Sequence, residues 1–210
     1  KKYTGGEFTF RGGRYDEARV AIVESGPGFA PARRATQALI EAHTPPYVVS
    51  CGFSGALQPE LQLGHIVMAN AITDMHGQEF PLTLNVPEQL PPGVHAGRLL
   101  VVDELVRTTE EKTALGQSHD ALAVDMESLA VAQVCRDLGV GFMAVRVISD
   151  DLATDLPVEI HSVLAATPGR RIGAAWRTRG STARRSEATP TRGRWTRRPA
   201  SPPRTAHWNP

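Results

Sequence analysis

The chain has 210 residues, of which 41% are hydrophobic and 21% charged, and its formal net charge is +1. This composition is that of a globular protein long enough to bury a core, and it excludes a collagen-like or wholly disordered chain. No apolar run reaches the roughly 18 residues of a membrane span, and no secretion signal opens the chain. Cys51 and Cys135 lie in apolar stretches and are expected to be reduced core thiols, so we expect a cytoplasmic protein.

The charge is unevenly distributed along the chain. Residues 168–210 hold 11 arginines and one acidic residue, whereas residues 1–167 have an excess of acidic side chains. An acidic body argues against a nucleic-acid-binding protein. We therefore expect one domain over residues 1–167, followed by a basic tail rich in arginine and proline. The tail has three open interpretations: a basic binding arm, a disordered segment, or translation in the wrong reading frame.

Short apolar runs alternate with stretches of helical periodicity in residues 1–167, a pattern typical of an α/β fold. In chain order, strands are predicted at residues 19–24, 47–51, 65–71, 98–102, 121–125 and 142–148, and helices at residues 31–43, 109–116 and 126–138. Thr108 and Thr109 are possible caps of the second helix. Residues 72–97 are predicted to form a long loop.

The first of three polar motifs follows the buried run at residues 47–49 and extends from Ser50 to Leu57, with glycines at Gly52 and Gly55. Glycines let the backbone approach a ligand closely, and free N–H groups can hold an anion. A tight turn would use the same residues, so this motif alone leaves both interpretations open.

The second motif, Asp125-Met126-Glu127-Ser128, lies where a predicted strand passes into a helix. A carboxylate in the first helical turn is stabilised as the anion by the helix dipole. Glu127 is therefore expected to stay ionised and could accept hydrogen bonds from a diol. The alternative is an ordinary charge at the start of a helix.

The third motif runs from Arg146 to Asp151, at the end of the last predicted strand. An aspartate in partly buried surroundings can carry a proton, so Asp150 could act as a general acid; it could also merely cap the next turn. All three motifs follow predicted strands and are expected to meet at one pocket. The seven histidines form no metal-binding pattern, so no metal is expected.

Together these motifs resemble the nucleoside phosphorylase superfamily, which contains purine nucleoside and uridine phosphorylases and methylthioadenosine/S-adenosylhomocysteine nucleosidases. The matching stretches are Ser25–Gly28, Gly52–Leu57, Leu63–Val67, Ala123–Ser128 and Val145–Asp150. Residues 102–108 and the form Val-Asp-Met-Glu-Ser most resemble the hopanoid-associated phosphorylases of bacteria.

The resemblance implies a central mixed, mostly parallel sheet flanked by helices, and we expect the family's first strand to be missing here. It implies an enzyme that cleaves the N-glycosidic bond of a purine nucleoside by phosphorolysis or hydrolysis. The partner is then a small-molecule nucleoside. No cofactor is implied, inorganic phosphate is a possible co-substrate, and a homo-oligomer is expected.

The resemblance also implies roles for residues near the second and third motifs. Asp150 would protonate or hydrogen-bond the purine N7, and Ser149 would help to hold its carboxyl group. Glu127 would bind the ribose hydroxyls and stabilise the cationic sugar of the transition state. Met126 would pack against the ribose.

Further residues would line the base and the nucleophile. The backbone of Leu105 and Val106 would line the base site. The residues facing phosphate or water would be Gly52, Phe53, Ser54 and Gly55. Two positions depart from the pattern of the phosphorylases: Ser50 stands where an arginine is common, and Phe53 where a serine is common. They leave phosphorolysis and hydrolysis open, and the alternative is a non-catalytic or incomplete homologue that binds nucleosides weakly or not at all.

Overall fold

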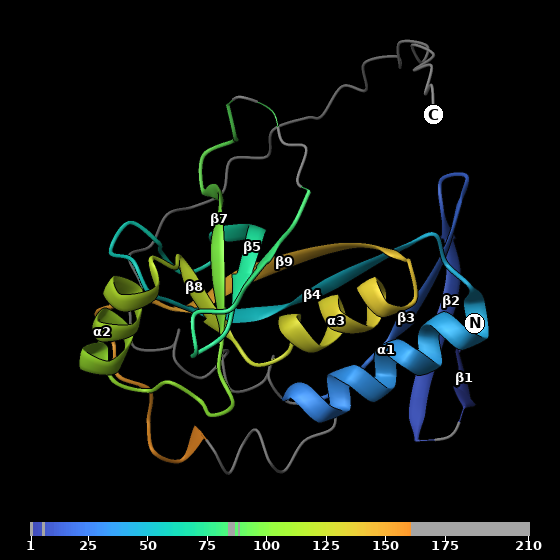
Figure 1. Ribbon diagram of the computed structural model, residues 1–210, viewed down its shortest axis with the longest axis horizontal. Coiled ribbons are helices and arrows are strands. Elements are labelled where there is room, and N and C mark those ends of the chain that lie inside the picture. The colour runs from blue at the N-terminus through green and yellow to red at the C-terminus, as the bar shows by residue number, and fades with distance from the viewer. Residues whose placement is uncertain (1, 6, 84–86, 88, 161–210) are drawn as a thin grey trace, which may run out of the picture.

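The computed structural model describes residues 2–5, 7–83, 87 and 89–160, so the predicted tail lies outside the described residues. Six strands form the central sheet in the order β6-β5-β7-β8-β4-β9 (Figure 1). Their bounds are β4 Tyr47–Ala56, β5 Ile66–Thr73, β6 Glu79–Pro81, β7 Val94–Val101, β8 Ala123–Asp125 and β9 Gly141–Asp150. Because β5 also pairs with β9, the sheet closes on itself through every strand except β6.

The two longest pairings of this sheet, β4 with β9 and β5 with β7, are parallel. The shorter pairings of β8 with β4, β5 with β6 and β5 with β9 are antiparallel. The predicted mixed, mostly parallel sheet with flanking helices is therefore confirmed. The predicted long loop at residues 72–97 is wrong in part, because it contains the end of β5, all of β6 and the start of β7.

A second, antiparallel sheet consists of β1 (Lys2–Gly5), β2 (Phe8–Tyr15) and β3 (Ala18–Val23). Of these only β3 was predicted, since the glycines and arginines of β2 interrupt its alternation. Phe8 and Phe10 of β2 pack against Ala35 of the first helix, and this contact holds the sheet beside that helix (Figure 1).

Helices α1 (Phe29–His43) and α3 (Ser128–Asp137) lie side by side (Figure 1). They bury Ile40 and Val134 against Val48 of β4. Helix α2 (Thr109–His119) lies at the far side of the central sheet from α1. Its predicted cap is confirmed, because Thr108 Oγ1 accepts from the Glu111 backbone N–H and the Glu111 carboxylate accepts from the Thr108 N–H. This reciprocal pair fixes where α2 begins.

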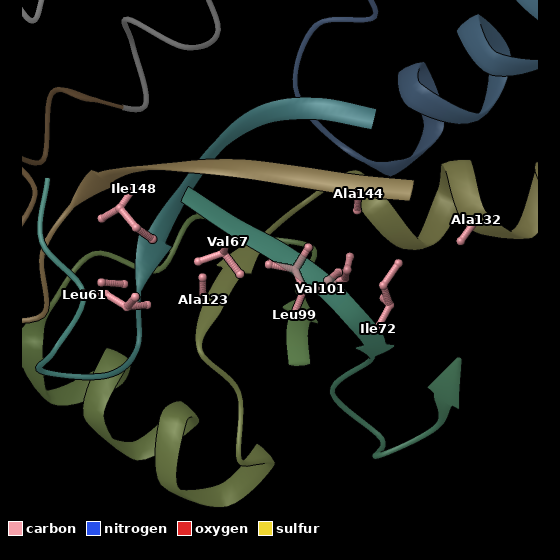
Figure 2. Close-up of a cluster of buried hydrophobic side chains, with 11 residues drawn as sticks. Leu61, Val67, Ile72, Leu99, Val101, Ala123, Ala132, Ala144 and Ile148 are labelled. Carbon is pink, nitrogen blue, oxygen red and sulfur yellow. The ribbon is translucent and has the colours of Figure 1, made fainter. Parts of the chain in front are cut away.

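The core of the central sheet is an aliphatic cluster on the inner faces of its strands (Figure 2). The labelled members from the strands are Val67, Ile72, Leu99, Val101, Ala123, Ala144 and Ile148. Of the two cysteines, Cys135 is buried as expected but Cys51 is exposed, so the prediction of two core thiols is wrong for Cys51. In the described part of the chain, none of the helices has the length and apolar character needed to cross a bilayer.

Candidate functional site

The stretch from Gly52 to Gly55 lies inside strand β4, not in a loop or tight turn as was predicted. Its parallel partner β9 places Arg146 beside Gly52 and Asp150 beside Gly55. On the other side of β4, Val124 of β8 pairs with Gly55. The three motifs therefore lie on three adjacent strands.

The reason for this arrangement differs from the one expected from the sequence. Strand β8 runs antiparallel to β4, so the ends of β8 and β9 do not share one edge of the sheet. The motifs meet because the closed sheet brings β8 across the end of β4, and the register then sets Asp125 next to Arg146.

Asp150 is buried, and both of its carboxylate oxygens are engaged. Ser149 Oγ donates to Oδ1 over 2.9 Å and also lies 3.2 Å from the Ser54 carbonyl oxygen. Lys112 Nζ lies 2.6 Å from Oδ2. A Cβ atom on Gly55 would lie 3.0 Å from Oδ2, so the absence of a side chain there leaves room for the carboxylate.

Sequence analysis missed Lys112. It is the fourth residue of α2, and no surface of its side chain is exposed. Besides Asp150, its ammonium group donates to the carbonyl oxygens of Asp151 and Thr154, over 2.9 and 3.1 Å. A lysine in a short helix ordinarily indicates a solvent-facing position, so no sequence signal could have found it.

Arg146 forms the centre of a second buried network. Its Nε donates to Asp125 Oδ2 over 2.6 Å, and Nη1 donates to the carbonyl oxygens of Ser50 and Val145. Its Nη2 donates to the hydroxyl groups of Ser50 and Ser128. A guanidinium has five N–H donors, so these five contacts satisfy all of them.

Glu127 is the N-cap residue of α3, and its Oε1 accepts from the Gly28 backbone N–H over 2.6 Å. Burial raises the pKa of Glu127, and the nearby Asp125 carboxylate raises it further. Burial therefore opposes the effect of the helix dipole on this carboxyl group, and the expectation that Glu127 stays ionised stays a prediction. Its link to Gly28 also brings the start of α1 next to the second motif.

The remaining predicted residues lie in two different settings. Met126 and Val106 pack against one buried cluster that contains Leu57 and Val124, so the structure brings them together. Leu105 is half-buried beside Val106. Phe53 is exposed, whereas Ser54 is buried and its Oγ has no hydrogen-bond partner among the described residues.

Two surface hollows include neither Glu127 nor Asp150. One is lined by residues at the start of α2 and in the segment 153–155, and the other by residues of β2 and α1. We place the candidate site at the hydrogen-bonded carboxyl groups of Asp150 and Glu127, because these side chains can take part in the chemistry and the hollows contain neither of them. Among the described residues, no three His, Cys, Asp or Glu side chains are grouped closely enough to hold a metal ion.

The sequence model of the phosphorylase superfamily matches this chain over residues 1–93 and 82–169. The chain therefore belongs to the phosphorylase superfamily. The predicted family is thereby confirmed, and with it the predicted class of enzyme, a nucleoside phosphorylase or nucleosidase. The closer resemblance to hopanoid-associated phosphorylases stays a prediction, as do the domain boundary at residue 167 and the roles of the site residues.

Two similar proteins are both named 5′-methylthioadenosine/S-adenosylhomocysteine nucleosidase. A 5′-methylthioadenosine/S-adenosylhomocysteine nucleosidase of Shewanella loihica is 28% identical over 74% of this chain and 78% of its own length. One of Staphylococcus epidermidis is 27% identical over 66% of this chain and 71% of its own length.

Solved structures agree in fold. A nucleosidase of this name from Colwellia psychrerythraea, in complex with adenine, has a TM-score of 0.63 and 24% identity over 80% of each chain. The S-adenosylhomocysteine nucleosidase of Streptococcus pyogenes has a TM-score of 0.63 and 20% identity, covering 80% of this chain and 81% of that one.

Proposed function

We propose that this chain hydrolyses the N-glycosidic bond of an adenine nucleoside carrying a 5′-thio substituent. The choice of nucleoside rests on the similar proteins, which are named as 5′-methylthioadenosine/S-adenosylhomocysteine nucleosidases. The chemistry rests on the engaged Asp150 at the end of β9 and on Glu127 beside β8.

In the proposed reaction the bond between C1′ of the ribose and N9 of adenine breaks, and its electron pair leaves with the base. Asp150 donates a proton to N7, which neutralises the departing base. A water molecule adds its oxygen to C1′ and releases one proton, which replaces the proton that Asp150 gave. The products are neutral adenine and the free 5′-thioribose sugar, so atoms and charge balance.

Glu127 has the properties needed for the sugar side of this reaction. Its side chain is half-buried, and the Gly28 N–H occupies one carboxylate oxygen, so the other can accept from ribose hydroxyl groups. A carboxylate in a dry site stabilises the positive charge that develops on the sugar. Met126 and Val106 pack against the same buried cluster, which suits them to contact ribose and base.

Hydrolysis, rather than phosphorolysis, is favoured by one observation on Arg146. This guanidinium lies beside Gly52, where the nucleophile is expected, but all of its N–H groups donate within the chain. A phosphate dianion needs a cation that is free to bind it. Ser50 accepts from Arg146 where the phosphorylases have an arginine of their own. We therefore assign water as the nucleophile.

Adenine release from 5′-methylthioadenosine, S-adenosylhomocysteine and adenosine, measured with and without inorganic phosphate, tests the proposal. We expect adenine from the two thio-nucleosides, free sugar as the other product, and no dependence on phosphate. A sugar 1-phosphate would show phosphorolysis instead. No adenine under any condition would support the incomplete homologue.

We also propose that the chain forms a homo-oligomer. Among the described strands, residues 47–53 of β4 pair only with β9, so no described strand covers the other edge of β4 along these residues. Tyr47, Val49 and Phe53 are exposed on this strand. An open apolar strand edge promotes association, which agrees with our further proposal of a homo-oligomer. Light scattering tests the assembly, and cell fractionation tests the proposed cytoplasmic location.

A further inference from the structure

We propose that Lys112 is a positioning residue for Asp150, which holds the carboxyl group in place and stabilises the carboxylate that proton transfer creates. This inference rests on the proposed function, since it needs Asp150 to be the acid that protonates the leaving base.

The Lys112 ammonium group is buried and fully hydrogen-bonded. Its side chain is fully buried, and its three N–H donors have three close acceptors: Asp150 Oδ2, the Asp151 carbonyl and the Thr154 carbonyl. A buried ammonium is costly unless it is paired and fully hydrogen-bonded. Among the described residues, the only charged partner within salt-bridge distance is the carboxylate that we assign to catalysis.

The helix that carries Lys112 is firmly attached to the segment that follows Asp150. The start of α2 is fixed to the segment that follows Asp150, because the Thr109 N–H and hydroxyl donate to Asp155 Oδ1 over 2.7 and 3.0 Å. The backbone N–H of Leu156 also donates to the Arg107 carbonyl. Lys112 thus reaches Asp150 from a helix that is already anchored. With Ser149 on Oδ1 and Lys112 on Oδ2, the carboxyl group is oriented before substrate binds.

The positive charge of Lys112 favours the transfer of the proton from Asp150 to the base. Asp150 pairs with Lys112 as a carboxylate in the resting protein, binds one proton when substrate enters, and becomes a buried carboxylate again when that proton passes to the base. Lys112 lies 2.6 Å from that carboxylate, and the attraction between the two charges is strong because little water screens it. The cation therefore favours the products of proton transfer, which is a contribution made in the transition state rather than in substrate binding.

The kinetic test uses Lys112→Met, Asp150→Asn and the double variant, with 5′-methylthioadenosine as substrate. Lys112→Met replaces the aliphatic part of the side chain with one of similar length and removes the ammonium group with its charge. We expect kcat to fall about tenfold or more and KM to change less than about threefold. In the Asp150→Asn background, Lys112→Met should change kcat less than about twofold, because Lys112 acts through Asp150.

Glu110→Gln is the matched control. It removes an exposed negative charge from the first turn of the same helix, and kcat should stay within about twofold of the parent. The proposal is overturned if Lys112→Met keeps the parent kcat. It is also overturned if Lys112→Met lowers kcat by the same factor with and without Asp150, since that is the behaviour of a merely structural residue.

Urea unfolding of the parent, Lys112→Met, Asp150→Asn and the double variant tests the ion pair by a measurement that does not depend on enzyme activity. Lys112→Met alone leaves a buried carboxylate unpaired, so the double variant should unfold at higher urea concentration than Lys112→Met. Shifts in the urea midpoint that simply add would overturn the pairing. If Lys112→Met does not fold, the double variant still can be compared with Asp150→Asn. If the unfolding data show that the two substitutions are coupled but the parent releases no adenine, the proposed function fails while the ion pair stands.

Discussion

Arg146 donates from Nε to Asp125 Oδ2 over 2.6 Å, and both side chains are almost completely buried. This pair connects β9 to β8 beneath the candidate site. Removing one partner of a buried ion pair leaves the other charge uncompensated, which costs about 3–5 kcal/mol. We expect Arg146→Met to lower the free energy of unfolding by about that amount, measured by urea denaturation. The exposed pair of Arg136 and Asp137 is the control, and Asp137→Asn should leave the urea midpoint unchanged.

Gly55 leaves space for the Asp150 carboxylate. A Cβ at this position would lie 3.0 Å from Asp150 Oδ2 and 3.4 Å from Val124 Cγ1, closer than most Cβ contacts. We expect Gly55→Ala to displace the carboxylate and to lower kcat for adenine release about tenfold or more. Gly13→Ala on β2, where a Cβ meets nothing within 4 Å, should behave like the parent. Equal activity of the two variants would contradict this account.

Asp150→Asn should reduce kcat about 10²–10⁴-fold while substrate binding largely survives. Asparagine can hydrogen-bond the purine but cannot deliver a proton. Steady-state kinetics and equilibrium binding of a substrate analogue separate the two effects. A loss in kcat below about threefold would remove Asp150 from the role of acid.

Glu127 makes stability depend on pH in a specific direction. Its pKa is raised above the ordinary value of 4.5, so the folded protein binds a proton here more tightly than the unfolded chain does. The resulting stabilisation is complete below pH 4.5 and is lost as the pH rises through the raised pKa. We expect the parent to lose stability relative to Glu127→Gln over this window, measured by urea unfolding at several pH values. Glu127→Gln should also weaken both binding and turnover, because it removes the charge facing the sugar.

The two thiols should react at different rates. Cys51 is exposed, whereas burial raises the pKa of the Cys135 thiol to about 11. Since the thiolate is the reactive form, a chromogenic disulfide reagent at pH 8 should modify one thiol quickly and the second only after denaturation. Cys51→Ser should abolish the fast reaction. Two fast thiols would show that the packing around Cys135 opens readily.

Much of the fold could be predicted from local pattern. The apolar runs of β4, β5, β7 and β9 and the cap of α2 were found because periodicity and capping depend on neighbouring residues. Strand β2 was missed, since Gly12 and Gly13 interrupt the alternation that marks a strand. The long predicted loop was partly wrong because three-residue β6 is held by pairing with β5, which no local pattern reports.

The sequence by itself determined the family and the chemical groups, because the Asp-Met-Glu-Ser and Arg-Val-Ile-Ser-Asp motifs are short and specific. Only the tertiary structure decided how these groups are arranged. It showed that β8 crosses the end of β4 antiparallel, that burial opposes the helix dipole at Glu127, and that Lys112 is paired with Asp150. Register, loss of water and long-range ion pairs depend on residues far apart in the chain, and therefore appear only when the chain is folded.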